Sequence, residues 1–361
     1  MDLNLVATIF DALEIAPPSK LILLEAQALA AAHVPPYPPD TPVLFMNIDS
    51  RQLASHLGTV LLTTYPEEHV VFVVSAGEKK ERQLLELSDH EYSEAVALYV
   101  PPLGEGTSFE SFAEIVAHLR APNGCPWDRE QTHESLRKHL LEESYEAISA
   151  IDSGDFTDMR EEFGDLLLQV VLQSQIANEE NQFNVNQVIQ GIHSKIVRRH
   201  PHVFGDLKVE GVEGVLSNWE KLKEKERGKK KDGKGLLDGV PLALPALSQA
   251  QEYQDRAARV GFDWPEIEGV LDKVKEEIEE IKNAETDFEL ASEIGDLFFA
   301  LVNVARWKHI DAESALRGTN MKFKKRFAYV EQGAKRQERN LSELSLEEMD
   351  VLWNEAKKQG L

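Results

Sequence analysis

Cysteine is almost missing from this sequence, since Cys125 is the only one. A single thiol excludes an intrachain disulfide and a Cys-x-x-Cys zinc site, so a reducing compartment is the simplest expectation. Long hydrophobic runs are missing too. The best candidate, residues 21–34, contains Glu25 and is shorter than the ~18 residues that a membrane-spanning helix needs. The start, MDLNLVATIF, lacks the basic segment of a secretory signal. We therefore expect a cytoplasmic protein that does not contact membranes.

Positive charge is also scarce. The 361 residues include 39 Lys and Arg against 63 Asp and Glu, which gives a formal net charge of −24. This excess of acid argues against nucleic acid as a partner, because phosphate backbones are bound by a surplus of basic side chains. A small phosphorylated ligand remains compatible, since divalent cations on clustered carboxylates reverse the local charge. With 42% hydrophobic residues, the chain has the composition of a globular protein of two or three domains.

The residue pattern changes about a third of the way along the chain. Residues 1–103 alternate helical stretches with short apolar, β-branched runs, which predicts a small α/β domain; the runs are residues 43–46, 59–64, 69–75 and 96–100. From residue 107 onward, amphipathic helical patterns dominate. We therefore expect an α+β multidomain protein: the α/β domain, then all-α helical bundles at 107–225 and 241–361, joined by a basic linker at 226–240.

The helical region contains an internal repeat. The first copy reads LEESYEAI (141–148) and EEFGDLLLQVV (161–171), and the second reads KEEIEEI (275–281) and SEIGDLFFALV (292–302). Each copy continues with a Lys-x-x-x-Arg pair and a Trp-x-x-x-Lys pair; these are Lys195/Arg199 and Trp219/Lys223, then Lys322/Arg326 and Trp353/Lys357. Because these features recur in one order, we predict a duplicated helical unit.

Acidic pairs recur within each copy. In the second copy, Glu277 and Glu280 are three residues apart, as are Glu293 and Asp296. Residues at this spacing share one face of a helix. The short segment between the two pairs predicts an antiparallel helix pair that brings the acidic faces together. The first copy repeats the arrangement with Glu143, Glu146, Glu162 and Asp165.

Four converging carboxylates repel one another and lose hydration unless a cation neutralises them. Oxygen ligands favour Mg²⁺, Mn²⁺ or Ca²⁺ over zinc, and Mg²⁺ commonly adds phosphate oxygens to its ligands. The apolar residues 297–299 directly follow Asp296, which indicates the edge of a core rather than an open surface. A di-iron site is disfavoured, because the Glu-x-x-His motif that it needs does not occur at these pairs. We predict a divalent metal site with a phosphorylated substrate.

These motifs resemble those of a known family. EExxE at 276–280 followed by ExxD at 293–296 is similar to the signature of the all-α nucleoside triphosphate pyrophosphohydrolases of the MazG family; further similar stretches are NGCPWD (123–128), RRHPHVFGD (198–206) and VGFDW (260–264). The resemblance implies a Mg²⁺-dependent enzyme, with Mn²⁺ as a second candidate ion, that splits a nucleoside triphosphate into the monophosphate and pyrophosphate. It also implies nucleotide-pool house-cleaning and a homodimer formed through the helical domains.

The resemblance also implies roles for single residues. The four acidic residues of each copy would bind metal, and Lys273, four residues before Glu277, would approach the triphosphate. Glu276 or Glu277 would accept the proton of the attacking water. Further substrate contacts are expected from the second copy; the candidates are Lys322 and Arg326 for phosphate, Trp353 for the base or for closing the pocket, and Asn320. Because the first copy has His139 where the second has Lys273, we expect the second copy to be the working site.

Residues 1–103 resemble, more faintly, the later half of a tetrapyrrole methylase domain, with LYVPPL (98–103) as its closing strand. Only Gly58 and Gly77 occur in the first hundred residues, so a Gly-rich loop for S-adenosylmethionine is not expected. We interpret this region as a remnant or an interaction module. Three alternatives stay open: a methyltransferase, a non-catalytic metal-binding scaffold that regulates a partner, and a related dUTP or phosphoribosyl-ATP pyrophosphohydrolase.

Overall fold

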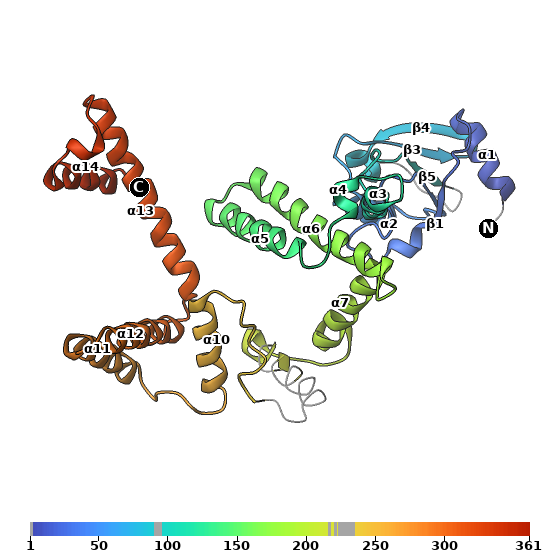
Figure 1. Cartoon of the computed structure of the whole chain (residues 1–361). Coiled ribbons are helices and arrows are strands. Elements are labelled where there is room, and N and C mark those ends of the chain that lie inside the picture. Colours follow the sequence, from blue (N-terminus) through green and yellow to red (C-terminus); the bar gives the residue numbers. More distant parts are fainter. Residues whose placement is uncertain (1–2, 90–95, 216–217, 220–221, 223–234) are drawn as a thin grey trace. The chain divides into compact units, whose positions relative to one another are not determined.

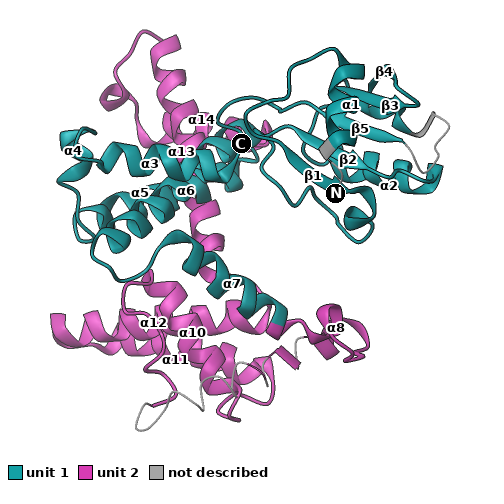
Figure 2. Ribbon diagram, turned by 90° about the vertical axis from the view of Figure 1, so that its right-hand side faces the viewer, with its two compact units in different colours: residues 1–197 teal, residues 198–361 magenta. Residues whose placement is uncertain are grey.

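The computed structural model describes residues 3–89, 96–215, 218, 219, 222 and 235–361 (Figure 1). The chain forms two compact units, residues 1–197 and 198–361 (Figure 2). The predicted fold class is confirmed, since a small α/β region precedes the helices. The domain boundaries stay a prediction, and Lys223 and most of the linker lie outside the described residues. Within the described part, every helix is too short or too polar to cross a membrane.

Unit 1 begins with a five-stranded mixed sheet. The strand order is β1-β2-β5-β3-β4, with β1 and β2 parallel and the other neighbours antiparallel. The elements of this region are α1 (Leu3–Leu13), β1 (Ile22–Glu25), η1 (Ala26–Leu29), β2 (Val43–Met46), α2 (Arg51–Leu61), β3 (Val70–Ser75), β4 (Glu78–Gln83), η2 (Leu84–Asp89) and β5 (Ala97–Val100).

Alternate residues of the central strands enter two separate cores. Phe45 on β2 faces the core formed with α2, η1 and η2, while Leu44 faces the core formed with α1. Because successive side chains of a strand point to opposite faces, a strand buried on both sides is hydrophobic throughout. All four residues of β2 and of β5 are buried accordingly. The α/β region therefore has three layers.

Three of the four predicted apolar runs, 43–46, 69–75 and 96–100, contain strands β2, β3 and β5. The fourth prediction is wrong, because residues 59–61 end helix α2 instead of forming a strand. The side chain of Ser50 accepts a hydrogen bond from the backbone N–H of Leu53 and caps this helix. Leu57 and Leu61, one helical turn apart, are both fully buried. Packing of this apolar face outweighs the strand preference of the β-branched residues.

Helices follow the sheet in unit 1; they are α3 (Phe109–Arg120), α4 (Pro126–Arg129), α5 (Leu136–Ser153), α6 (Phe156–Glu179) and α7 (Val185–Arg199). Helices α5 and α6 form the expected antiparallel pair around Gly154, whose φ of 72° favours glycine. The core of this pair contains Val116, Leu136 and Leu172.

Unit 2 contains the second helical region; its elements are α8 (Pro201–Phe204), α10 (Ala246–Ala258), α11 (Ile267–Asn283), α12 (Asp287–Trp307), α13 (Ala312–Arg336), η3 (Leu341–Glu343) and α14 (Leu346–Lys358). Helices α11 and α12 are paired as α5 and α6 are. Thr286 caps α12 and forms a reciprocal capping box with Glu289. Helix α10 packs on α12, and α13 packs on α14. The hairpin α11–α12 carries the second set of acidic pairs.

Candidate active site: two carboxylate clusters and a cavity

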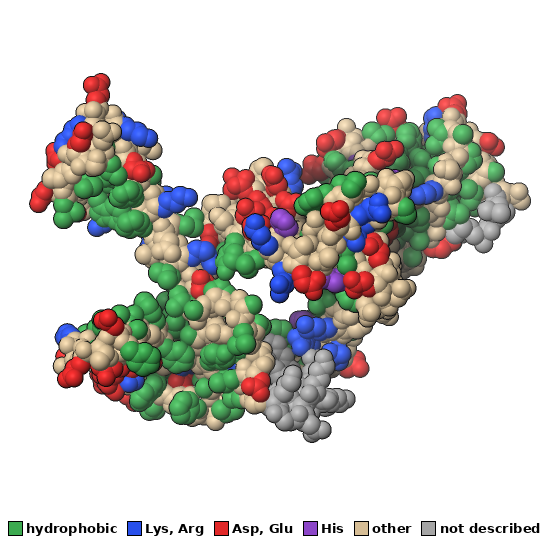
Figure 3. All heavy atoms as spheres, in the orientation of Figure 1, with side chains coloured by type: hydrophobic (Ala, Val, Ile, Leu, Met, Phe, Trp, Pro, Cys, Tyr) green, Lys and Arg blue, Asp and Glu red, His purple; other side chains and the backbone are tan. Residues whose placement is uncertain are grey.

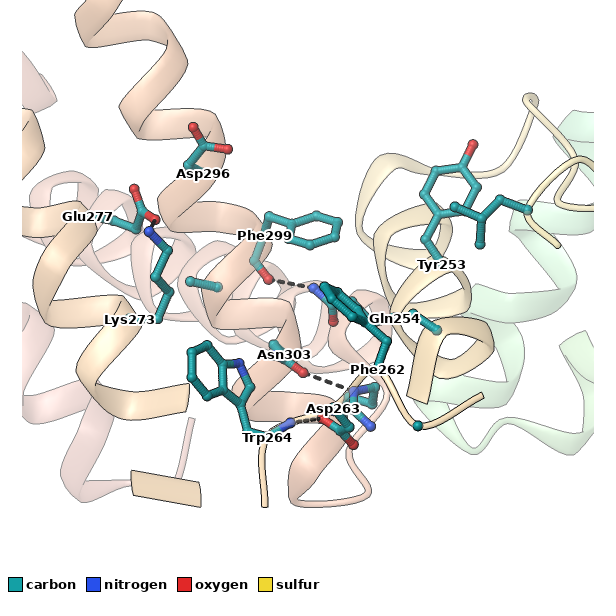
Figure 4. Close-up of a pocket in the computed structure, with 15 residues that line it drawn as sticks. Tyr253, Gln254, Phe262, Asp263, Trp264, Lys273, Glu277, Asp296, Phe299 and Asn303 are labelled. Carbon is teal, nitrogen blue, oxygen red and sulfur yellow. Dashed lines mark hydrogen bonds and ion pairs between the residues drawn. The ribbon is translucent and has the colours of Figure 1, made fainter. Parts of the chain in front are cut away.

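The second acidic cluster is formed by Glu277 and Glu280 of α11 and Glu293 of α12. One carboxylate oxygen from each lies within 4.8 Å of the other two. Asp296, one turn further along α12, lines the same cavity as Glu277 (Figure 4). The i, i+3 spacing on two antiparallel helices therefore brings the acidic faces together, as expected from the sequence.

Glu277 is the buried member of this cluster, with 2% of its surface exposed. Its Oε1 lies 2.6 Å from Nζ of Lys273, which also lies 2.9 Å from Glu276. Oε2 is buried and accepts no hydrogen bond from the described residues. Hydrogen bonds to Glu277 and Glu276 raise the pKa of Lys273. A buried carboxylate oxygen without a donor is costly, so the site fits an additional cation at this atom.

The electrostatics of the second acidic cluster also favour a bound cation. Loss of hydration, followed by interaction with Glu277 and Glu293, raises the pKa of Glu280. Three carboxylates at this separation supply the oxygen donors that hard divalent cations prefer. The donor set therefore fits a hard divalent cation and contains no soft ligand.

The first acidic cluster has the same construction from α5 and α6. Oxygens of Glu143, Glu146 and Glu162 lie within 4.8 Å of one another. Loss of hydration raises the pKa of Glu143 and of Glu162, and repulsion from Asp165 adds to both shifts. His139 takes the place of Lys273, but its Nδ1 lies 3.3 Å from Glu142, which is outside the cluster. The two clusters therefore share their acids and differ in the basic neighbour.

A cavity of about 620 Å³ opens beside the second cluster (Figure 4). This volume is typical of sites for small organic ligands. Its lining combines cluster residues with aromatic and amide side chains; these are Leu237, Tyr253, Gln254, Ala257, Gly261, Phe262, Asp263, Trp264, Lys273, Glu277, Asp296, Phe299, Ala300, Asn303 and Arg306. Figure 4 shows Glu277, Lys273 and Asp296 at one side and Tyr253 and Gln254 at the other.

Ionic hydrogen bonds hold one wall of the cavity. Arg306 of α12 donates from Nη2 to Oδ1 of Asp263 at 2.5 Å and from Nε to Oδ1 of Asn303 at 2.9 Å. Trp307 donates its indole N–H to the same oxygen of Asp263 at 3.2 Å. Partial burial opposes ionisation of Asp263, but these bonds prevail and lower its pKa. The wall formed by Phe262 and Trp264 is thereby tied to α12.

Comparison with known proteins identifies the family. The model of the MazG nucleotide pyrophosphohydrolase domain matches residues 131–204 and again 267–330. The nucleoside triphosphate pyrophosphohydrolase/pyrophosphatase MazG of Thermotoga maritima is 44% identical over 252 residues, which cover 70% of this chain and 96% of that protein. This chain belongs to the MazG family. Its predicted recognition as a MazG protein, and as an enzyme of this class, is therefore confirmed.

Two further MazG relatives are similar over comparable or longer stretches. The nucleoside triphosphate pyrophosphohydrolase of Escherichia coli K12 is 45% identical over 253 residues, or 68% of this chain and 96% of that protein. The uncharacterised protein YabN of Bacillus subtilis is 40% identical over 330 residues, or 88% of this chain and 67% of that protein. Because the latter match is longer than the helical region, it includes part of the α/β region. The methylase resemblance itself stays a prediction.

Each MazG domain match contains the acidic motifs of one copy of the repeat. The first match contains the carboxylates of the first cluster, and the second contains Lys273 and the carboxylates of the second. The aromatic–basic pair recurs as well. The guanidinium carbon lies 5.7 Å from the indole centroid both for Arg199 and Trp219 and for Arg326 and Trp353. The two copies therefore share details beyond their acidic motifs.

Four predicted substrate contacts lie outside the described lining of this MazG cavity. Asn320 and Lys322 are exposed on α13. Nε of Arg326 donates to the carbonyl oxygen of Leu361 at 2.7 Å. The ring of Trp353 lies 5.2 Å from that of Phe323 and packs on a buried cluster of α13 and α14. The structure does not bring these side chains to the cavity, and their roles stay a prediction.

Three polar residues of the cavity wall were not predicted from the sequence: Gln254, Asn303 and Arg306. Each is a single polar residue within a helix, so no motif marks it. A weak signal was available: Asn303 and Arg306 are three residues apart on the strongly apolar helix α12. Polar residues at this spacing share a face and must find partners when they are buried.

Proposed function

We propose that this protein hydrolyses nucleoside triphosphates to the monophosphate and pyrophosphate in the presence of Mg²⁺, and that it thereby clears the nucleotide pool. One observation carries the proposal: a buried carboxylate oxygen of Glu277 has no hydrogen-bond donor among the described residues, and it lies within a triad of acids at the side of a ligand-sized cavity. The names of the MazG relatives support the reaction class. Mn²⁺ is the second candidate ion, since it accepts the same ligands.

In the proposed site, the metal would be held through oxygen by Glu277, Glu280, Glu293 and Asp296. Bound Mg²⁺ supplies charge neutralisation and polarises the phosphoryl oxygens. Lys273, which lies 2.6 Å from Glu277, would supply its ammonium to the triphosphate. Glu276 is exposed and adjacent, so its carboxylate can accept the proton of the attacking water. Glu277 is the alternative base. Phosphoryl transfer depends mainly on such positioning and neutralisation.

The remaining contacts are proposed from the C-terminal helices. Lys322 and Arg326 would bind phosphate oxygens, Asn320 would add a polar contact, and Trp353 would close the site. The first cluster, Glu143, Glu146, Glu162 and Asp165, would bind a second metal. The second copy is the proposed working site, since it has Lys273.

We also propose a homodimer formed through the helical domains. Hydrophobic side chains cover much of the visible surface of α10 to α12 (Figure 3). Phe288 and Phe298 on α12 are 85% and 57% exposed. Exposed apolar surface of this kind is typical of protein–protein contacts.

The test is a product analysis with purified protein, Mg²⁺ or Mn²⁺, and a panel of nucleotides that includes dUTP and phosphoribosyl-ATP. We expect monophosphate and pyrophosphate, and loss of both after chelation. Glu280→Gln should remove activity, while Glu279→Gln should retain it, because Glu279 pairs with Lys282 at 2.7 Å and lies outside the triad. Diphosphate plus orthophosphate would refute the proposed cleavage. Mg²⁺ binding without turnover of any nucleotide would instead favour the regulatory scaffold.

A further inference from the structure

The end of the predicted linker between the two copies, residues 235–240, forms neither a helix nor a strand, and we call it the strap. It is closed into turns by its own hydrogen bonds. Oδ2 of Asp238 accepts from the backbone N–H of Gly235 at 2.6 Å, and the N–H of Val240 donates to the carbonyl oxygen of Leu237 at 3.0 Å. Val240 is 5% exposed, whereas residues 235–239 are all exposed. The strap therefore has a defined shape but few buried side chains.

A buried arginine of α10 holds the strap by its backbone. Arg256 is 5% exposed; its Nη1 donates to the carbonyl oxygen of Leu236 at 3.2 Å, and its Nη2 donates to that of Gly239 at 2.9 Å. Nε donates to Oε1 of Glu252, one turn earlier on the helix, at 2.8 Å. A Cβ on Gly239 would lie 3.0 Å from Nη1, so the glycine allows this close approach. One side chain thus anchors the strap at two points.

Leu237 lies between these two anchor points in the sequence, and it lines the cavity beside the second cluster. Tyr253 and Ala257 of α10 line the same cavity, and Ala257 directly follows Arg256. The hydrogen bonds of Arg256 therefore fix the position at which the strap meets the cavity. Leu237 is 42% exposed, so it has apolar surface that a bound ligand can cover.

The strap can leave Arg256 without disturbing a helix. Both of its acceptors are backbone carbonyls of a non-helical segment, and the guanidinium would keep Glu252 as a partner. Segments with few buried side chains open first in native proteins, and loops that close over ligands are of this kind. Hydrogen bonds from a charged donor favour the closed position, because they are stronger than those between neutral groups. This combination suits a segment that is closed at rest and opens for ligand exchange.

We propose that the strap is a lid of the cavity and that Arg256 is its positioning residue. In the closed position, Leu237 covers the bound ligand and slows its release. Because this contact is apolar, it retains nucleotides irrespective of their base. The inference rests on the proposed function only for the class of ligand, a nucleoside triphosphate. The connection between the two copies thereby takes part in the site of the second copy.

A double-mutant cycle tests whether Arg256 acts through Leu237. The probe is α,β-methylene ATP with Mg²⁺, which resists cleavage between the α and β phosphates, and calorimetry on the full chain measures its Kd. Leu237→Ala should weaken binding about tenfold, the effect of burying roughly two methylene groups. Arg256→Met should weaken binding by a similar factor, and the double variant should bind no more weakly than either single variant, because both substitutions remove the same contact. An arginine that only stabilises the fold would instead give effects that multiply.

Leu236→Ala is the matched control. Leu236 is the neighbouring residue of the strap and is 40% exposed, but it is not among the described residues that line the cavity. The substitution keeps the backbone carbonyl that accepts from Arg256. The Kd of the probe should therefore remain within about twofold of that of the natural protein.

Hydrogen exchange of the backbone amides reports on the strap directly. Saturation with the probe should slow exchange at residues 235–240 of the natural protein, and Arg256→Met should accelerate it in the free protein. If Arg256→Met does not fold, Gly239→Ala replaces it in the cycle. Its Cβ would displace the strap from Nη1 without removing the buried arginine.

Multiplicative effects in the cycle, or unchanged exchange of the strap on saturation, would overturn the lid. If ATP is cleaved to the monophosphate and pyrophosphate while the strap shows neither effect, only the lid fails. If the strap responds as expected but ATP is not cleaved, the proposed hydrolysis fails and the lid stands. If calorimetry detects no nucleotide binding, both proposals fail.

Discussion

Glu277→Gln should weaken Mg²⁺ binding at the second cluster by about thirtyfold. The substitution keeps the shape of the side chain and removes the charge of the buried member of the triad. Changes in the residues that merely orient metal ligands weaken metal binding by 10–100-fold. A direct carboxylate ligand should therefore contribute at least the upper value, which corresponds to about 2.7 kcal/mol.

The ion pair with Lys273 reduces this expected loss. In the free protein, Lys273 lies 2.6 Å from Glu277 and competes with a metal for the carboxylate. The lysine side chain is 39% exposed, so we assign the pair a surface value of about 0.7 kcal/mol. Removing Glu277 removes this competition too, which leaves a net loss of about 2 kcal/mol, or about thirtyfold in Kd.

Titration calorimetry with Mg²⁺ measures this change in the full chain. A Glu162→Gln background disables the first cluster, so that the heat reports the second. Glu279→Gln in that background is the control, since Glu279 is exposed and pairs with Lys282. If Glu277→Gln and Glu279→Gln bind Mg²⁺ with the same affinity, the triad is not a metal site and the reasoning fails.

Three further predictions concern pH, the cavity wall and helix packing. Loss of hydration, with repulsion from neighbouring carboxylates, raises the pKa of Glu143 and Glu280 above 4.5. Their contribution to stability is therefore present at acidic pH and is lost as pH rises through the raised values, so the Tm gain from Mg²⁺ should be larger at pH 7.5 than at pH 5. Arg306→Met should raise KM for ATP about tenfold in steady-state kinetics, because it releases Asp263 and the adjacent aromatic wall. Gly333→Ala should lower the free energy of unfolding by about 1–3 kcal/mol in urea, since its Cβ would lie 2.6 Å from Leu352, whereas Gly318→Ala on the same helix meets open space and should not destabilise.

The helical part of the fold could be predicted because local signals agree there. Apolar residues at helical spacing, the capping box at Thr286 and Glu289, and the glycine at position 154 all specify the same hairpins. The convergence of the acidic residues could be predicted directly from the sequence. Residues at i, i+3 spacing share one face of a helix, and two antiparallel helices place such faces opposite each other.

The edge of the sheet could not be predicted in the same way. Strand β4 has the sequence EKKERQ, which is polar at every position and lacks the alternation that indicates a strand. Its backbone pairs with β3, and its charges protect the sheet edge against pairing with other chains. Residues 59–61 show the opposite error. They were predicted to be a strand because the run is β-branched and apolar, but Val60 and Leu61 belong to the buried face of helix α2.

The orientations of the amide groups in the cavity wall could not be predicted from the sequence, because they depend on contacts between helices. The orientation of the Gln254 amide depends on the backbone carbonyl of Phe299, which is on another helix 45 residues away. Asn303 depends in turn on Arg306 and Asp263. Such orientations are properties of packed helices, and no local pattern encodes them.

The difference between the two copies now has a physical explanation. In the second copy, one oxygen of Glu277 is held by Lys273 and the other is buried without a donor among the described residues, an arrangement that costs stability. In the first copy, Glu143 is only half-buried, and the basic neighbour is His139, directed to Glu142. Buried polar groups without a hydrogen-bond partner lower the stability of the fold, and such groups are typical of functional sites. The second copy bears this cost beside a cavity of ligand size, which is why we propose the reaction there.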